Sequence, residues 1–428
     1  MHPYDGDELM RASTPPPTRP PHPHGGKRAL VLCGGGITGL TYEVGALRAL
    51  DDVLVDMSVN DFDIFVGTSA GSIISALLAN AISPTEIALS LHDPRSQYQL
   101  PSPWVLYQPN FKEMFQRSLR LPRAVWEFAD LLLKTPQTLN LFDLLDAVTL
   151  LLPSGLCDPA GLMNYLHTIL TSRTYTDDFS QLDSDLFVVT CALDTEQRVV
   201  FSRHQHPHVP ISQAVTASSA VPMLFKPVRI DGIDYVDGGT KGISAIDVAV
   251  DNGAKLIVVI NPIVPVDAEE VPHPEHNHLA SGTRLASLGF RSVYNQVFRG
   301  MLHDSLVDHI QLVRERHPDV DILLIEPRSD DDKMFFHELM SFSARLMVLQ
   351  HGYESVSNGL SDSWDAVSKL FPRHGIHVTR RVIDMKPLQV PPATVDSPHI
   401  LQRILRQTVF QRRTPLQILE DGDIDTAS

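Results

Sequence analysis

The chain has 428 residues, of which 43% are hydrophobic and 20% are charged, as in an ordinary soluble globular protein long enough for two or three domains. Its 35 Lys and Arg residues against 51 Asp and Glu residues give a formal charge of −16, so we expect no nucleic-acid partner, which would require a basic surface. The three cysteines are widely spaced and form neither a disulfide framework nor a metal-ligand pattern.

The N-terminal segment is rich in Pro, His and polar residues, and it lacks a basic start followed by an apolar core. We therefore expect residues 1–27 to be a disordered tail without a secretory signal. The uncharged run 64–85 is long enough to span a bilayer, but its glycines and hydroxyl residues favour a buried strand, a tight turn and a buried helix. With no signal peptide or transmembrane helix evident, we expect a cytoplasmic or peripheral membrane protein.

The first structured region predicts strand, glycine loop, helix, strand, tight turn and helix. We expect these elements at residues 29–33 (strand), 41–54 (helix), 62–66 (strand) and 71–81 (helix). Because βαβα order implies a parallel sheet covered by helices, the predicted fold class is α/β, with a mainly parallel central sheet flanked by helices.

Residues 91–180 interrupt this pattern with prolines and aromatics, followed by leucines on one helical face in TLNLFDLLDAVTLLL. We expect a helical insertion that either covers the core or acts as a lid or lipid-contact surface. Its candidate interfacial anchors are Trp104, Tyr107, Phe111, Phe115 and Trp126, and its local positive charges are Lys112, Arg117, Arg120, Arg123 and Lys134. Aromatics in the core and charges on a solvated face are an equally open interpretation.

Strand patterns return further along the chain. We expect strands at residues 186–192, 198–201, 255–260 and 321–325, a hairpin in PVRIDGIDYVDGG and a packing helix at 334–352. The Asp231-Gly232 pair predicts the turn of the hairpin. The structured domain is therefore expected to cover residues 28–375, followed by a polar tail at 376–428.

The stretch VGTSAGS places Ser69 between an apolar strand and an apolar helix, flanked by Gly67 and Gly71. This G-x-S-x-G context is typical of a nucleophile elbow, in which the glycines permit a sharp turn and the helix N-terminus favours developing negative charge. A simple strand-to-helix turn capped by Ser69 is the alternative. An α/β-hydrolase is disfavoured, because in that fold several strands normally precede the elbow.

Two further glycine motifs stand on either side of the elbow. In GGGITG, the residues Gly34, Gly36 and Gly39 satisfy G-x-G-x-x-G, a dinucleotide-binding pattern. The acidic residues near the distance expected for a ribose contact are Asp51, Asp52 and Asp56. In DYVDGG, the carboxylate of Asp237 ends a predicted strand before two glycines. The alternative is a polar turn, because Asp-Gly is a common turn pair.

Together, and in this order, the three motifs resemble those of the patatin-like phospholipase family. The resemblance rests on Gly34, Gly35, Gly36 and Gly39, on Gly67, Ser69 and Gly71, and on Asp237, Gly238 and Gly239, with family-like flanking text in LTYEVGALRAL, ALDTEQRVVF and ISQAVTASSAVPMLFKPV. It covers residues 28–260 and extends to about 370. Where the family often has Lys or Arg, this chain has Thr38. A dinucleotide site would leave the second and third motifs unexplained.

The resemblance implies a patatin-like three-layer sandwich and a lipid acyl hydrolase of phospholipase A or lysophospholipase type. Ser69 and Asp237 would form the catalytic dyad, and Gly34, Gly35 and Gly36 would hold the oxyanion. The other glycines would support the motifs. No cofactor or metal is implied, and the partner is a lipid substrate at a membrane surface.

Two histidine-rich stretches offer an alternative that involves zinc. They are HQHPH, with His204, His206 and His208, and HPEHNH, with His273, His276 and His278. Both lie in Pro-containing, loop-like sequence, so we expect solvated loop histidines. Two other functions stay open: a catalytically silent lipid-binding scaffold on the same fold, and an esterase or acyltransferase for soluble acyl groups.

Overall fold

The structure is a computed structural model that describes residues 26–91, 96, 100, 102–119, 149, 152–172, 174–267, 284–331, 334 and 339–380. The chain divides into two units, Met1–Leu388 and Gln389–Ser428, and all of the described residues belong to the first. The predicted helix in TLNLFDLLDAVTLLL lies mostly outside the described residues. The predicted tails lie almost entirely outside them, and the domain boundaries stay predictions.

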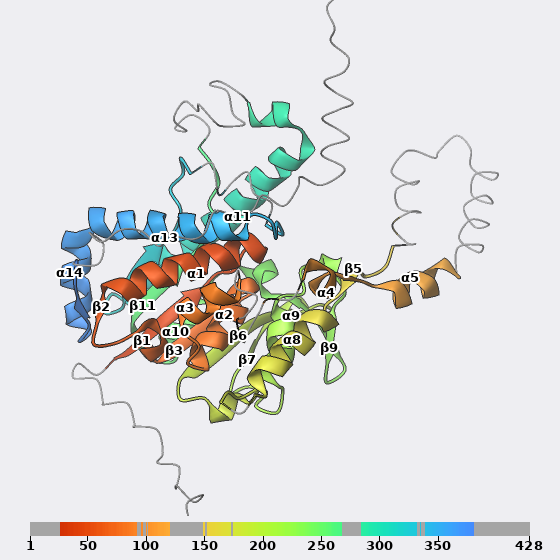
Figure 1. Ribbon diagram of the computed structural model, residues 1–428, viewed down its shortest axis with the longest axis horizontal. Coiled ribbons are helices and arrows are strands. Elements are labelled where there is room, and N and C mark those ends of the chain that lie inside the picture. Colours follow the sequence, from red (N-terminus) through yellow and green to blue (C-terminus); the bar gives the residue numbers. More distant parts are fainter. Residues whose placement is uncertain are drawn as a thin grey trace, which may run out of the picture. The chain divides into compact units, whose positions relative to one another are not determined.

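An eight-stranded sheet in the order β12-β11-β1-β3-β6-β10-β9, with β7 beside β6, organises the fold (Figure 1). Its strands are β1 (Lys27–Leu32), β3 (Ile64–Thr68), β6 (Asp185–Ala192), β7 (Gln197–Phe201), β9 (Val228–Ile230), β10 (Ile233–Asp237), β11 (Ala254–Ile260) and β12 (Asp321–Ile325). The first five strands of that order pair in parallel, whereas β7, β9 and β10 pair antiparallel. The predicted α/β class with a mainly parallel sheet is confirmed.

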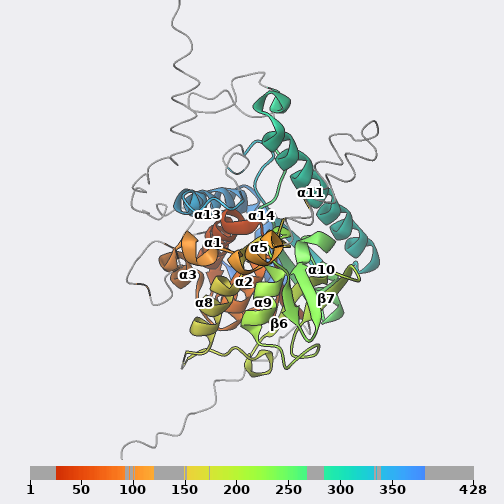
Figure 2. The same ribbon diagram turned by 90° about the vertical axis from the view of Figure 1, so that its right-hand side faces the viewer.

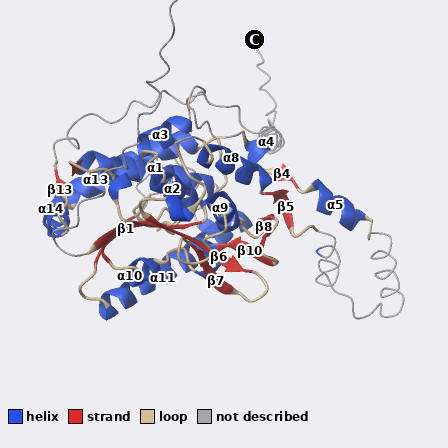
Figure 3. Ribbon diagram, turned by 90° about the horizontal axis from the view of Figure 1, so that it is seen from below, coloured by secondary structure: helices blue, strands red, loops and turns tan. Residues whose placement is uncertain are grey.

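Helices cover both faces of this sheet, as Figure 3 shows. The described helices are α1 (Gly36–Val53), α2 (Ala70–Ala79), α3 (Pro84–Ser90), α4 (Pro103–Leu106), α5 (Phe111–Ser118), α8 (Ala160–Leu170), α9 (Ile211–Ser218), α10 (Ile246–Asp251), α11 (Phe290–Arg316), α13 (Arg345–Asp362) and α14 (Trp364–Arg373), of which α5 projects away from the sheet. Short 3-10 turns are η1 (Val59–Asp61), η2 (Phe179–Gln181), η3 (Gly238–Lys241) and η4 (Leu285–Leu288). Two small sheets pair β13 (His377–Val378) with β2 (Leu54–Val55), and join β4 (Gln108–Pro109), β5 (Gly155–Asp158) and β8 (Met223–Phe225).

The alternation of side chains along β1 explains the two layers of helices. Leu30 and Leu32 pack into one core with α1, α2, α9 and α13, whereas Ala29 and Val31 pack into a second core with α10 and α11. A strand buried on both faces reads as a continuous apolar run, which is why these strands were predictable. Figure 2 shows α10 and α11 on one side of the sheet and α1, α2 and α13 on the other.

Close helix packing fixes α13 against α1. A Cβ atom added at Gly45 would lie 2.3 Å from the Leu349 carbonyl oxygen, and one at Gly352 would lie 2.7 Å from the Tyr42 carbonyl oxygen. The helix predicted at residues 334–352 overlaps only in part with α13, which begins at Arg345 and ends at Asp362, and residues 335–338 lie outside the described residues. Its tertiary contact with α1, which a local pattern does not contain, determines where it packs.

Candidate active site

Ser69 occupies a strained turn between β3 and α2. All five residues of β3 are buried, and Ser69 has φ 54° and ψ −130°, a conformation that residues other than glycine rarely adopt. A Cβ atom at Gly67 would lie 2.4 Å from the Ser72 Cα atom, and one at Gly71 would lie 2.3 Å from the Leu32 carbonyl oxygen. Only glycine therefore fits on either side of this turn.

Two serines from the end of α9 hold the backbone of the turn. The Ser69 amide donates to Ser218 Oγ over 2.9 Å, and Ser219 Oγ donates to the Ser69 carbonyl oxygen over 3.2 Å. Ser218 Oγ also donates to the Val189 carbonyl oxygen over 2.6 Å, so α9 links the turn to β6. No role for these two serines, in the stretch SSAVP, was predicted from the sequence. Such tandem hydroxyls beside a Gly-Ser turn are the signal that was missed.

Asp237 reaches the same place from the other side of β6. Thr68 pairs with Val189 and Asp237 pairs with Thr190, so the ends of β3 and β10 lie at one level of the sheet. The Asp237 side chain is buried, and its Oδ1 atom accepts the Gly239 amide over 2.7 Å.

Burial raises the pKa of Asp237 to about 6, although the Ser69 side chain and the Gly239 amide both stabilise the charged carboxylate. A Cβ atom at Gly238 would lie 2.3 Å from the Val189 carbonyl oxygen, so this glycine permits the close approach to β6. The structure thus brings Ser69 and Asp237 together, although they are far apart in the sequence.

The first glycine motif lies directly on the Ser69 turn. Gly34, Gly35 and Gly36 have φ values of 81°, 124° and 65°, three successive residues in the region that favours glycine. A Cβ atom at Gly34 would lie 2.5 Å from the Thr68 carbonyl oxygen and 3.0 Å from Ser69 Cβ. At Gly39 it would lie 2.6 Å from the Gly34 carbonyl oxygen. Side chains are thereby excluded from the contact between loop and turn.

The amides of this loop differ in what they bind. The Gly34 amide donates to Glu43 Oε1 over 2.8 Å. Within the described residues, the amides of Gly35 and Gly36 donate to no protein group. Because α1 begins at Gly36, these two amides lie at a helix N-terminus, which favours negative charge. Glu43 was not singled out from the sequence, although it is the single charged residue between positions 29 and 47.

An apolar pocket extends from the Ser69 turn. Gly36 and Ser69 lie in its wall, and the rest of its lining is almost wholly apolar, including Ile73, Leu162 and Phe225. It encloses about 60 Å³. This is well below the roughly 300–1,000 Å³ of typical small-molecule sites.

The chain after β12 completes this pocket. Met340 lies in its wall, and the Leu339 carbonyl oxygen accepts the Thr38 amide over 3.1 Å and the Thr38 hydroxyl over 3.4 Å. Thr38 is fully buried, so the position where the family often has a basic residue here anchors a distant segment to the glycine loop.

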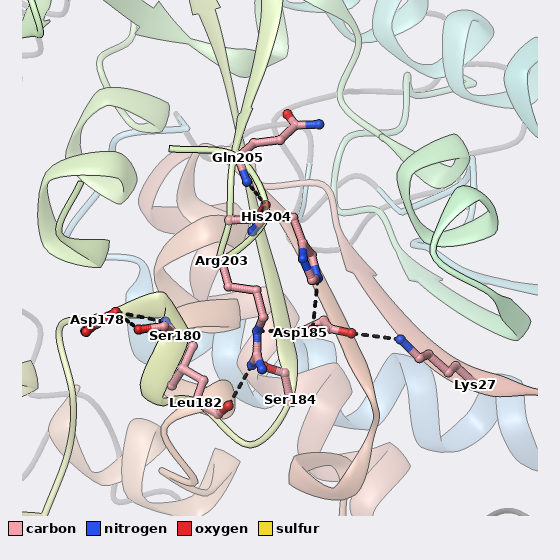
Figure 4. A network of polar contacts seen from close by, with 10 residues as sticks. Lys27, Asp178, Ser180, Leu182, Ser184, Asp185, Arg203, His204 and Gln205 are labelled. Atoms are coloured by element: carbon pink, nitrogen blue, oxygen red, sulfur yellow. Dashed lines mark hydrogen bonds and ion pairs between the residues drawn. The ribbon is translucent and has the colours of Figure 1, made fainter. Parts of the chain in front are cut away.

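The three histidines of HQHPH have different neighbours. His204 approaches Asp185, which is also contacted by Lys27 at 2.8 Å and Arg203 at 3.2 Å (Figure 4). Asp185 begins β6, at the end of the sheet away from the Ser69 turn, since it pairs with Ile64 at the start of β3. This carboxylate therefore joins strand ends.

The other two histidines of this stretch have separate partners. His208 pairs with Asp231 at 2.7 Å, and the His206 ring lies 5.2 Å from the Phe201 ring. Over the part of the chain that the structure describes, no group of three or more His, Cys, Asp or Glu residues could hold a metal ion. The second histidine stretch, with His273, His276 and His278, lies outside the described residues.

Two of the acidic residues considered for the alternative of a dinucleotide site bind groups of the protein itself. Asp51 Oδ1 accepts the Val59 amide over 2.8 Å, and Asp52 Oδ2 accepts the Tyr353 hydroxyl over 2.7 Å. Both carboxylates thus fasten α1 to its neighbours.

Among the described helices, none is long and apolar enough to cross a membrane.

The comparison with protein families shows which family this chain belongs to. The family model described as patatin-like phospholipase matches residues 30–250, which contain all three glycine motifs. The chain belongs to the patatin-like phospholipase family. The resemblance inferred from the motifs is thereby confirmed.

Two viral proteins are similar to this patatin-like chain. An uncharacterized protein of Acanthamoeba polyphaga mimivirus is 26% identical over 212 residues, covering 49% of this chain and 57% of that protein. A protein described as a "Probable lipid hydrolase", from Invertebrate iridescent virus 6, is 25% identical over 229 residues, covering 52% of this chain and 63% of that protein. The match thus spans less than two thirds of either relative.

Solved structures of bacterial proteins are also similar to the patatin-like chain. VipD from Legionella pneumophila has 17% identity and a TM-score of 0.33, with 79% of this chain and 67% of that chain covered. ExoU of Pseudomonas aeruginosa, solved in complex with SpcU, has 16% identity and a TM-score of 0.30, with 79% and 53% covered.

Proposed function

We propose that this chain is a lipid acyl hydrolase in which Ser69 attacks a carboxylic ester and Asp237 is its base. The observation that carries the proposal is the meeting of the two side chains beside a glycine loop and an apolar pocket. Membership of the family and the similarity to a viral protein named as a lipid hydrolase support the reaction class.

In the proposed reaction, Asp237 takes the Ser69 proton as Oγ attacks the ester carbonyl carbon. The tetrahedral oxyanion accepts hydrogen bonds from the amides of Gly35 and Gly36 at the N-terminus of α1. The Gly34 amide does not donate to the oxyanion, because it already donates to Glu43 and so supports the loop. As the intermediate collapses, the C–O bond to the leaving alcohol breaks and Asp237 returns the proton to the alcohol oxygen.

Hydrolysis of the acyl-enzyme reverses these roles. Asp237 removes a proton from water, the hydroxide attacks the acyl carbon, and Ser69 leaves with the proton while the fatty acid is released. The raised pKa of Asp237, about 6, makes it a stronger base than an ordinary aspartate and still leaves it mostly ionised at pH 7. Burial thus adapts a weak base to this task.

The apolar pocket is proposed to hold the acyl chain, with the ester at Ser69. Its volume of about 60 Å³ also favours a second candidate, an esterase for short soluble acyl groups. A series of p-nitrophenyl esters from acetate to palmitate distinguishes the two. Rates that rise with chain length support lipid substrates, whereas a maximum at the shortest chains supports the esterase.

A fluorophosphonate probe tests the nucleophile itself and the catalytically silent alternative. We expect the wild type to be labelled and Ser69→Ala to be unlabelled. Ser75→Ala is the matched control, because Ser75 is buried in the same helix α2 and its hydroxyl has no hydrogen-bond partner among the described residues. This control should be labelled as fast as the wild type. An unlabelled wild type would support the silent scaffold.

We also propose that the surface beside the pocket contacts a membrane. Apolar side chains on the elements that carry or follow the lining residues Leu106 and Phe225 are exposed: Trp104 by 80% on α4, Phe111 by 68% and Phe115 by 66% on α5, and Met223 by 76% on β8. Exposed aromatics are suited to the membrane interface. Of the basic side chains expected here, Lys112 is exposed and Arg117 pairs with Glu113 at 3.0 Å. Arg120, Arg123 and Lys134, like the aromatic Trp126, lie outside the described residues.

Vesicle sedimentation tests this surface. Replacing Trp104, Phe111 and Phe115 together with serine should lower the vesicle-bound fraction several-fold. Replacing Phe290 and Tyr294 with serine is the control, because both are exposed on α11, which contributes no described residue to the pocket. Equal loss in the two variants would contradict a contact specific to the pocket side.

A further inference from the structure

Glu43 is a fully buried carboxyl group behind the glycine loop. It belongs to α1, its exposed fraction is 0%, and it reaches back nine residues to the Gly34 amide. Its Oε2 atom has no hydrogen-bond partner among the described residues. Buried acidic groups are rarely retained without a partner or a function, and the proposed reaction does not use this one directly.

Within the described residues, few other hydrogen bonds restrain the loop. Its three successive residues lie in the left-handed region, and glycine has more backbone freedom to lose than any other residue. The Gly39 amide donates to the Gly35 carbonyl oxygen over 3.0 Å, and Thr38 anchors the start of α1 to Leu339. Within the described residues, Glu43 supplies the side-chain hydrogen bond to the first glycine.

The orientation of the loop follows from that bond. With its amide directed to Glu43, Gly34 cannot donate to an oxyanion at the same time. Within the described part of the chain, the amides of Gly35 and Gly36 remain without a protein acceptor, and Gly36 lines the same pocket as Ser69. We propose that Glu43 is a positioning residue whose carboxyl oxygen holds the Gly34 amide and so presents the amides of Gly35 and Gly36 to the oxyanion. This inference rests on the proposed acyl-hydrolase function.

The charge of Glu43 is compatible with this role. Burial raises the pKa of its carboxyl group well above the ordinary value. Hydrogen bonds from the amides of Gly34 and Cys33 lower the pKa by less than burial raises it. The neighbouring titratable groups are the Cys33 thiol and, beyond it, Glu326, which bring no positive charge that would favour ionisation. A neutral carboxyl can accept the Gly34 amide without adding a negative charge beside the developing oxyanion. Glutamine offers the same kind of oxygen acceptor and is itself uncharged.

Three variants test the proposal through the hydrolysis of one soluble ester. Glu43→Met keeps the length of the side chain and removes the carboxyl oxygen, and we expect kcat to fall about 10- to 100-fold with KM changed by less than about threefold. Glu43→Gln should recover kcat to within about threefold of the wild type. Thermal unfolding of each variant shows whether it is folded. If Glu43→Met does not fold, Glu43→Asp replaces it, because the shorter side chain withdraws the acceptor from Gly34.

The outcomes separate this inference from the proposed function. A fall in kcat at constant KM, recovered by glutamine, supports the positioning role. Unchanged kcat in a folded variant without the acceptor, or a loss in Glu43→Gln as large as in Glu43→Met, overturns it while Ser69-dependent hydrolysis by the wild type stands. A wild type without hydrolysis or fluorophosphonate labelling overturns both.

Discussion

Replacing Asp237 with asparagine should stabilise the protein while abolishing hydrolysis. The folded-state pKa of Asp237 is raised by burial from 3.8 to about 6, so the native state binds this proton more tightly than the unfolded chain does. The stability associated with the protonated group is fully present below pH 3.8 and is lost as the pH rises through about 6. Ionised Asp237 therefore destabilises the native state at neutral pH.

The size of this effect follows from linkage. The difference between the two pKa values corresponds to about 3 kcal/mol at pH 7, about 1.5 kcal/mol at pH 5 and about 0.5 kcal/mol at pH 4. Asparagine does not titrate in this range, so its free energy of unfolding relative to the wild type should decrease by about 1.5 kcal/mol between pH 7 and pH 5. Changes in hydrogen bonding to Gly239 or Ser69 that do not depend on pH cancel in this comparison.

Urea unfolding of the wild type and Asp237→Asn at pH 7 and pH 5 measures the effect. Asp194→Asn, an exposed aspartate in the turn between β6 and β7, controls for the loss of one carboxylate. A stability difference that does not change with pH, or one that grows on acidification, would refute the reasoning that Asp237 is destabilised by burial.

Three further predictions concern the reaction and the pocket. The pH profile of kcat/KM should have an acidic limb with a midpoint near 6, because Asp237 must be ionised to accept the Ser69 proton; a midpoint near 4 would contradict the effect of burial. Ser69→Gly should eliminate hydrolysis and raise the free energy of unfolding by about 1 kcal/mol in urea titrations, since glycine relieves the strain at φ 54° at some cost in chain entropy; a less stable variant would argue against strain there. Leu162→Trp should lower kcat/KM for long acyl esters relative to short ones by about tenfold, whereas Leu89→Trp, on the exposed face of α3, should leave the ratio unchanged; identical ratios in both would remove the pocket from chain-length selection.

The parallel strands could be predicted from the sequence because burial on both faces gives continuous apolar runs. The run at residues 29–33 became β1, Lys27–Leu32, and the hairpin turn formed at Asp231 and Gly232 with positive φ at both residues. The first helix was predicted to begin at residue 41, but α1 begins at Gly36, because helix propensity does not reveal that a glycine loop continues directly into a helix. Local periodicity thus located elements better than their ends.

The long helix α11 escaped prediction for a different reason. Its exposed apolar residues, such as Phe290 and Met301, and its buried Arg299 blur the amphipathic pattern on which sequence analysis depends. The Arg299 guanidinium donates to the carbonyl oxygens of Val264 and Met334 over 3.3 and 2.8 Å, so tertiary partners satisfy a charge that a pattern would assign to the surface. Burial here depends on contacts made by other elements.

The candidate site was predictable as a set of motifs and not as a geometry. Ser69 and Asp237 were selected by resemblance, whereas their meeting depends on β6 lying between β3 and β10. The roles of Glu43 and Met340 depend on the folded chain, since Met340 reaches the glycine loop from the segment after β12. A single charged residue within an apolar stretch was the local sign of Glu43.

Hydrolysis of phospholipid vesicles by the wild type, Ser69→Ala and Asp237→Asn tests the central claim most directly. Released fatty acid and lysolipid are quantified together, with Ser75→Ala as the control. We predict that the wild type and Ser75→Ala release both products and that the two site variants release neither while remaining folded. Undiminished release by folded Ser69→Ala would contradict the assignment of Ser69 as the nucleophile.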